Sequence, residues 1–251
     1  IDDAVAVGSM PAILVNECLT PALSSASRKD VLPMRLARIA ALSDGDVRFN
    51  GMLATYAMLA AWMDRDDESL NRLTVELTDF LMLPETGVDK NLHRFARYMQ
   101  FLCNYRKKYA DLYTAAPSGR LNVIGDSHCL SPVGAVFDWL GERLRGCGYL
   151  VAGVKMHHLA QAGANRYQRE VEEFLKVTPF DEPLLLTVGE IDCRPDSGVW
   201  KAWHKRGGSL EEIVANTVDG YLNWLAGRLA KTRHSAVTLQ GIPAPGYIQA
   251  E

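Results

Sequence analysis

Hydrophobic and polar positions follow different patterns in the two halves of the chain. In the first half, apolar residues recur every three or four positions, as they do on one face of an α-helix. This spacing predicts helices over residues 34–42, 49–63, 69–83 and 91–113. The polar stretch 64–67 connects the helices over 49–63 and 69–83, which together form a helical hairpin. Residues 1–30 show no sustained period. We therefore predict an all-helical N-terminal region over residues 1–118.

After Gly119, short apolar runs of strand length alternate with helix-like segments. The strands are predicted over residues 121–124, 149–155, 183–188 and 236–239, and the helices over about 133–146, 165–176 and 209–231. This alternation predicts an α/β domain with a parallel sheet and helices on both faces. The last helix has the clearest signature, because Ser209 and Glu212 form a capping box and an apolar stripe follows. The stripe is Leu210, Val214, Val218, Leu222, Leu225 and Leu229.

A serine lies in the turn after the first of these apolar runs. Gly125-Asp126-Ser127 follows residues 121–124 directly, and Ser131-Pro132 is typical of a helix cap and first helical residue. Open α/β sheets bind ligands at the carboxyl ends of their strands. A turn at a helix N-terminus also supplies N–H groups for a developing oxyanion, so Ser127 is a candidate nucleophile. A plain turn without chemistry fits the same three residues.

Two blocks together resemble the SGNH (GDSL-like) hydrolases. Gly125-Asp126-Ser127-His128 resembles the first signature block of that family. Residues 189–194, Gly-Glu-Ile-Asp-Cys-Arg, are similar to its Gly-x-Asn-Asp block as it stands in a divergent bacterial subgroup. The resemblance implies a flavodoxin-like sheet over residues 119–251 and a serine-dependent ester hydrolase. Acetyl or acyl groups on a glycan are the substrate class that it suggests.

The resemblance also assigns roles to individual residues. Ser127 attacks the ester carbonyl, the N–H groups of Ser127 and Gly163 stabilise the oxyanion, and Asp192 belongs to the catalytic set. Ile191 stands where the family has an oxyanion-hole Asn, and isoleucine donates no hydrogen bond. The substrate-binding candidates are Asp126, His128, Gly189, Glu190 and Arg194. Arg194 can replace the missing donor or bind an anionic group, but an ion pair with Glu190 or Asp192 fits equally well.

The family's general base, a histidine three residues after an aspartate near the C-terminus, has no counterpart in this sequence. A flavodoxin-like sheet would also add another helix and a fifth parallel strand after residues 236–239. Three explanations stay open: a C-terminal piece is missing, His128 or His204 acts as the base, or catalysis has been lost. An acyltransferase that uses the same serine and a non-catalytic binding protein are therefore alternatives to the hydrolase.

Net charge and cysteine spacing limit the classes of partner and the cellular compartment that we expect. A formal net charge of -3, from 27 basic and 30 acidic residues, gives no general reason to expect nucleic acid or an anionic membrane. The five scattered cysteines contain no C-x-x-C pair and fit reduced thiols in a cytoplasmic protein. No cofactor is expected. The expected partners are a small-molecule or glycan ester at the site and a protein or second copy at the helical region.

Six further residues have two interpretations each. His157 and His158 would point to opposite faces of a strand, which argues against a shared metal ion. Asn165 is expected to cap the helix over 165–176 rather than to serve as a side-chain hydrogen-bond donor at the site. Cys129 is a weaker rival to Ser127 as nucleophile. Trp200 and Trp203 fit either a sugar-stacking wall or, more commonly, the core.

Overall fold

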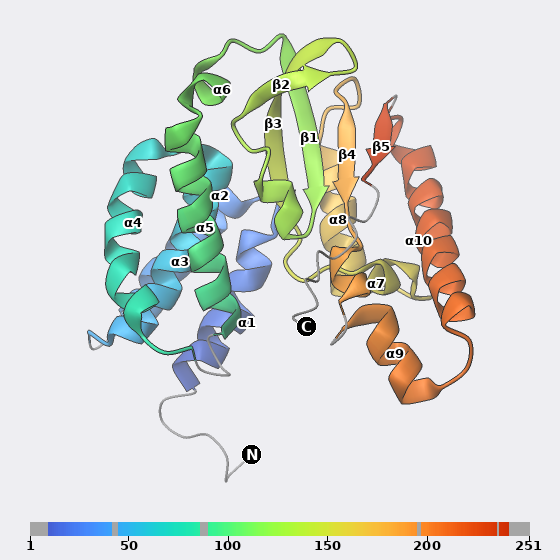
Figure 1. The fold of residues 1–251 in the computed structure, drawn as a ribbon, viewed down its shortest axis with the longest axis horizontal. Helices are drawn as coiled ribbons and strands as arrows, with labels where there is room; N and C mark the ends of the chain where they lie inside the picture. The colour runs from blue at the N-terminus through green and yellow to red at the C-terminus, as the bar shows by residue number, and fades with distance from the viewer. Residues whose placement is uncertain (1–9, 42–44, 86–89, 195–196, 235, 241–251) are drawn as a thin grey trace, which may run out of the picture. The chain divides into compact units, whose positions relative to one another are not determined.

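The computed structural model describes residues 10–41, 45–85, 90–194, 197–234 and 236–240 (Figure 1). The chain divides into two compact units, residues 1–117 with 133–143 and residues 118–132 with 144–251. Within the described residues, no helix has the length and apolar character needed to cross a membrane.

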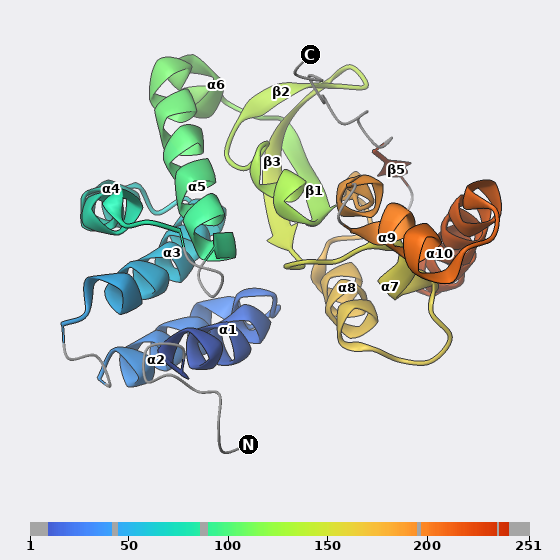
Figure 2. The same ribbon diagram turned by 60° about the horizontal axis from the view of Figure 1, so that its bottom comes forward.

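The first unit is built mainly from helices, as the spacing of apolar residues predicts. Its helices are α1 (Met10–Leu23), α2 (Arg28–Ala40), α3 (Val47–Asp64), α4 (Asp67–Met82), α5 (Lys90–Lys108) and α6 (Ala110–Thr114). The predicted hairpin is confirmed in α3 and α4, where Arg65 ends α3 in the left-handed region and Asp66 caps α4 through the N–H of Ser69. α1 and α2 lie side by side (Figure 2), although residues 1–30 show no helical period.

The five strands form one mixed sheet. They are β1 (Gly119–Gly125), β2 (Val136–Trp139), β3 (Glu142–Leu150), β4 (Leu184–Thr187) and β5 (Val237–Leu239), in the order β2-β3-β1-β4-β5. β1 pairs in parallel with β3 and β4, and β4 pairs in parallel with β5. The predicted parallel sheet is therefore confirmed for four strands. β2 runs antiparallel to β3, because only Leu140 and Gly141 connect them.

The helix predicted over about 133–146 is wrong, and Ser131-Pro132 caps no helix there. The segment forms the β2–β3 hairpin, whose turn places Leu140 at φ 51° and Gly141 at φ 88°. Two successive positive φ values are the signature of the tight turn that suits the twist of paired strands. In β3, buried and partly exposed residues alternate from Leu144 to Leu150. Two of the buried positions are glycines, so the strand carries little hydrophobic signal in the sequence.

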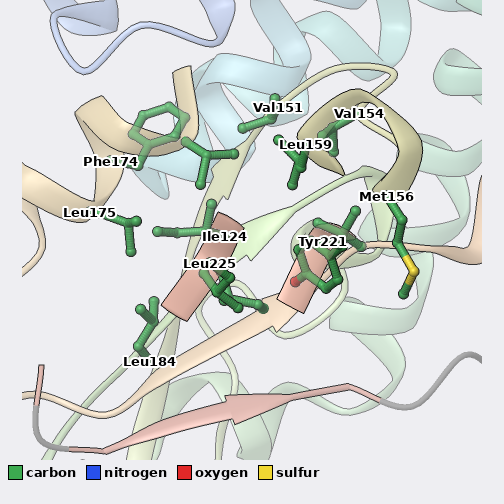
Figure 3. Packing of buried hydrophobic residues seen from close by; sticks show 13 residues of the cluster. Ile124, Val151, Val154, Met156, Leu159, Phe174, Leu175, Leu184, Tyr221 and Leu225 are labelled. Atoms are coloured by element: carbon green, nitrogen blue, oxygen red, sulfur yellow. The ribbon is translucent and has the colours of Figure 1, made fainter. Parts of the chain in front are cut away.

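Of the four helices described in the second unit, three pack on one face of the sheet. The helices are α7 (Met156–Ala160), α8 (Arg166–Val177), α9 (Gly198–Arg206) and α10 (Leu210–Thr232), with 3-10 turns η1 (Ser127–Leu130) and η2 (Glu190–Cys193). α8 and α10 confirm two predicted helices. Figure 3 shows Ile124 and Leu184 of the sheet packed with Phe174 of α8 and Tyr221 of α10. The prediction of helices on both faces is wrong for this unit, because the segment predicted as its first helix forms the β2–β3 hairpin instead.

Two details of the second unit differ from the sequence predictions. The second predicted strand, 149–155, is a strand only to Leu150, and its remainder leads into α7. On α10, Leu225 of the predicted stripe is buried, but Val214 and Leu222 are exposed. Ser209 does cap α10 through the N–H of Glu212, and its hydroxyl donates to Glu211.

Candidate functional site

The strand order places a topological switch between β1 and β4. From β1 the chain passes to β3 on one side, and from β3 it crosses to β4 on the other side of β1. In open α/β sheets, ligands bind outside the carboxyl ends of the strands at such a point. The segments leaving these two ends are residues 126–130 and 188–194. The two blocks identified in the sequence therefore follow neighbouring strand ends.

Gly125 allows the two strand ends to approach closely. It pairs with Thr187 across β1 and β4, and a Cβ atom at Gly125 would overlap the side chain and carbonyl group of Thr187. The N–H of Asp126 then donates to the carbonyl oxygen of Thr187 at 3.2 Å. A side chain at position 125 would therefore displace the turn that carries Ser127.

Asp126 organises the turn around Ser127. Its carboxyl group is 1% exposed, and Oδ1 accepts the backbone N–H of His128 at 3.0 Å, which caps η1. The same oxygen lies 2.9 Å from Nδ1 of the His128 ring. Oδ2 is buried and has no hydrogen-bond partner among the described residues. Ser127 is the first residue of η1 and is half-buried.

The His128 ring links the two blocks electrostatically. Its hydrogen bond with Asp126 raises the pKa of His128 above the usual value, and partial burial opposes this rise. The charges of Asp126 and Glu190 raise the pKa further, whereas Arg194 lowers it. His128 therefore lies in the field of residues from the second block as well as its own.

Arg194 and Glu190 form an ion pair within the second block. Nε of Arg194 donates to both carboxylate oxygens of Glu190 at 3.0 Å, and Nη2 donates to Oε2 at 2.6 Å. The sequence left open an ion pair with Glu190 or with Asp192, and the described structure has the pair with Glu190. This pairing fixes the orientation of the guanidinium group beside η2.

Asp192 connects η2 to α7 and holds His157. The Asp192 side chain is 3% exposed. Oδ2 accepts the backbone N–H of Met156 at 2.7 Å, and Oδ1 lies 3.3 Å from Nδ1 of His157. A Cβ atom at Gly198 would overlap the backbone of Asp192, so close packing of α9 keeps this aspartate in place. A buried carboxylate on Nδ1 is the arrangement that orients the histidine of a Ser-His-Asp triad.

Sequence reasoning missed the His157–Asp192 pair. It placed His157 in a strand and weighed it only as a metal ligand. In the structure the residue lies in α7, and its partner is 35 positions away. No local spacing signals a contact of this kind. The signal available in the sequence was the predicted parallel sheet, because the segments that follow parallel strands leave from the same edge.

His158 has a different environment from its neighbour. The prediction of rings on opposite faces is wrong, because both histidines lie in α7 with ring centroids 4.2 Å apart. His158 stacks on Tyr167 at 4.0 Å, and burial, with the charges of His157 and Lys155, lowers its pKa to about 4. His158 is therefore neutral at pH 7. Across the described ranges, no group of three or more potential ligands that could hold a metal ion is found.

The other candidates are spread over the unit. Gly163 lies in an exposed turn between α7 and α8, at φ 87°. Asn165 caps α8 in a reciprocal pair with Gln168, which confirms its expected role. Cys129 is fully buried, so it is not accessible as a nucleophile. His204 lies on the exposed side of α9.

Comparisons with protein-family models, curated proteins and solved structures found no match to this chain.

Proposed function

We propose that the chain is a serine-dependent ester hydrolase of the SGNH type, with Ser127 as nucleophile. The observation that carries this proposal is the position of Ser127. It begins a capped turn at the carboxyl end of the central strand β1, beside the switch between β1 and β4. The parallel strands lie in the order β3-β1-β4-β5. Counted without the antiparallel β2, this order is 2-1-3-4, which agrees with the first four positions of the flavodoxin-like order 2-1-3-4-5.

Ser127 needs a group that removes its hydroxyl proton, and two histidines have the required form. Nδ1 of His128 faces Asp126, and Nδ1 of His157 faces Asp192. When Nδ1 donates to a carboxylate, Nε2 of the neutral ring carries the lone pair that can accept a proton. Each pair therefore resembles the base and orienting group of a catalytic triad.

We assign the proton-accepting role to His157 and a substrate contact to His128. Side chains of adjacent residues in a tight turn diverge, and the His128 ring bends back toward Asp126. Its raised pKa also favours the protonated ring, which donates hydrogen bonds and accepts none. In this assignment His128 supplies the hydrogen-bond donor that Ile191 lacks, and Nε2 of His157 accepts the proton.

The resulting reaction is acyl transfer to water through an acyl-enzyme. Ser127 Oγ attacks the ester carbonyl while His157 takes its proton, and the proton then passes to the leaving alcohol. Water attacks the acyl-enzyme in the second step and releases the acid and free Ser127. The N–H groups of Ser127 and Gly163 remain the proposed oxyanion donors. An acylated glycan is the proposed substrate.

Hydrolysis of a simple ester tests the proposal. Wild-type protein should release acetate from p-nitrophenyl acetate, and Ser127→Ala should remove this activity. Ser131→Ala is the matched control, because Ser131 is exposed at the end of the same turn and donates only to the carbonyl oxygen of His128. If wild type and Ser127→Ala release acetate equally slowly, the chain is a binding protein rather than an enzyme. Transfer of acetate to an added sugar would instead identify an acyltransferase.

A further inference from the structure

The outward side of α5 carries basic and aromatic residues. The helix contains Lys90, Arg94, Arg97, Arg106, Lys107 and Lys108, and no Asp or Glu. Its buried residues, such as Met99 and Leu102, face the core of the helical unit. On the opposite side, one row along the helix contains Arg94, Arg97, Phe101, Tyr105 and Lys108. We call this row the basic–aromatic stripe.

The stripe is continuous, because its members are spaced three or four residues apart. Phe101 is 60% exposed and Tyr105 is 40% exposed, which is unusual for large aromatic side chains. Their ring centroids are 6.2 Å apart, and Tyr109 extends the row at 4.4 Å from Tyr105. The exposed rings therefore form an apolar ridge with cationic groups at both ends.

We propose that the basic–aromatic stripe binds an acidic polysaccharide, a glycan that carries carboxylate groups. The C–H faces of sugar rings pack on the exposed aromatic rings, and the tyrosine hydroxyls can hydrogen-bond to sugar hydroxyls. Arg94 at one end and Lys108 at the other supply charges for the carboxylates. The positive charge of α5 contrasts with the chain as a whole, which has a net charge of -3.

Two other occupants fit less well. A second copy docked stripe against stripe would bring cations of two α5 helices together, which is repulsive. A single-stranded nucleic acid binds a surface of this kind through bases that stack on aromatic rings. Tyr105 and Tyr109 already contact each other, so no base can stack between their rings.

The binding inference does not rest on the hydrolase proposal. All residues of the stripe belong to the helical unit, and Ser127 belongs to the other unit. Ser127→Ala should therefore bind the polysaccharide as the wild type does. A protein that binds but does not hydrolyse, or hydrolyses but does not bind, would separate the two proposals.

Affinity electrophoresis in native gels that contain polygalacturonate tests the inference. Wild-type protein should be retarded there and should migrate normally in gels with neutral dextran. We expect Phe101→Ala and Tyr105→Ala each to weaken binding about tenfold, which corresponds to about 1.4 kcal/mol. Arg94→Gln with Lys108→Gln should weaken it similarly and reduce its dependence on salt.

Two controls match these variants. Lys107→Gln removes the same charge from the same helix but away from the stripe, and Val75→Ala removes an exposed apolar side chain from α4. Both should bind as the wild type does. The inference is overturned if the wild type is not retarded, if the controls weaken binding as much as the stripe variants, or if oligothymidylate binds more tightly than polygalacturonate.

Discussion

Two carboxylate–histidine pairs give the candidate site its chemistry at the scale of single residues. Asp126 and Asp192 are both buried, and each holds Nδ1 of a half-exposed histidine. The two pairs differ in origin, because His128 belongs to the same turn as its partner and His157 comes from a different element. This difference lets substitutions distinguish a proton acceptor from a substrate contact.

His157→Gln should lower kcat/KM for p-nitrophenyl acetate by about 10²–10⁴-fold, the range that a general base contributes. Asp192→Asn should act in the same direction, because an amide N–H facing Nδ1 favours the wrong tautomer. His158→Gln is the control, since His158 is the adjacent ring and stacks on Tyr167. Full activity in His157→Gln, with a loss in His128→Gln, would transfer the role of base to His128.

The pH dependence of stability should report the Asp126–His128 contact. The folded-state pKa of His128 is raised, so the contact stabilises the folded protein fully below the unfolded value of about 6.5. That contribution is lost as the pH rises through the higher folded-state pKa. Urea unfolding of wild type and His128→Gln over this window measures it. A difference between the two proteins that grows as the pH rises would contradict this prediction.

At the scale of elements, the ends of β1 and β4 position the candidate site. Gly125→Ala should destabilise the protein by about 1–3 kcal/mol, because the added methyl group overlaps Thr187. Gly227→Ala is the contrasting variant, since Gly227 lies in α10 with open space around it. It should stabilise by about 0.5–1 kcal/mol. Urea unfolding of both variants checks the pair, and a neutral Gly125→Ala would show that the strand ends are not held closely.

The β2–β3 turn offers a second test of an element. Leu140 is exposed and adopts a positive φ, which costs a branched side chain about 1 kcal/mol relative to residues that tolerate it. Leu140→Asn creates the Asn-Gly pair preferred in such turns and should raise the free energy of unfolding by about that amount. A lower unfolding free energy would mean that the Leu140 side chain has a packing role.

The elements also show where sequence patterns succeed. Regular spacing of apolar residues predicted α3, α4 and α8, because large side chains line the buried face of each helix. The apolar stripe and the Ser209 cap predicted α10 as well, although part of that stripe is exposed. The hairpin was missed because Leu140-Gly141 lacks the usual turn asparagine and because Gly146 and Gly148 carry no hydrophobic signal. Their small size is required at least at Gly146, where a Cβ atom would overlap the carbonyl group of Pro132.

At the scale of the whole molecule, the sequence indicated which residues follow which strands, but not the contacts they make. The two blocks were recognised from local motifs, and parallel pairing brings their strands together. His157 was missed because its contact with Asp192 depends on how η2, α7 and α9 pack. The basic–aromatic stripe was also missed, because a net charge of -3 conceals a helix with no acidic residue.

Covalent labelling tests the central claim, that Ser127 is an activated nucleophile, most directly. The full-length wild type would be treated with a fluorophosphonate probe and its intact mass and labelled peptide determined. We expect one adduct, located on Ser127, which is absent in Ser127→Ala and retained in Ser131→Ala. An unlabelled wild type, or an adduct on another residue that persists in Ser127→Ala, would contradict the claim.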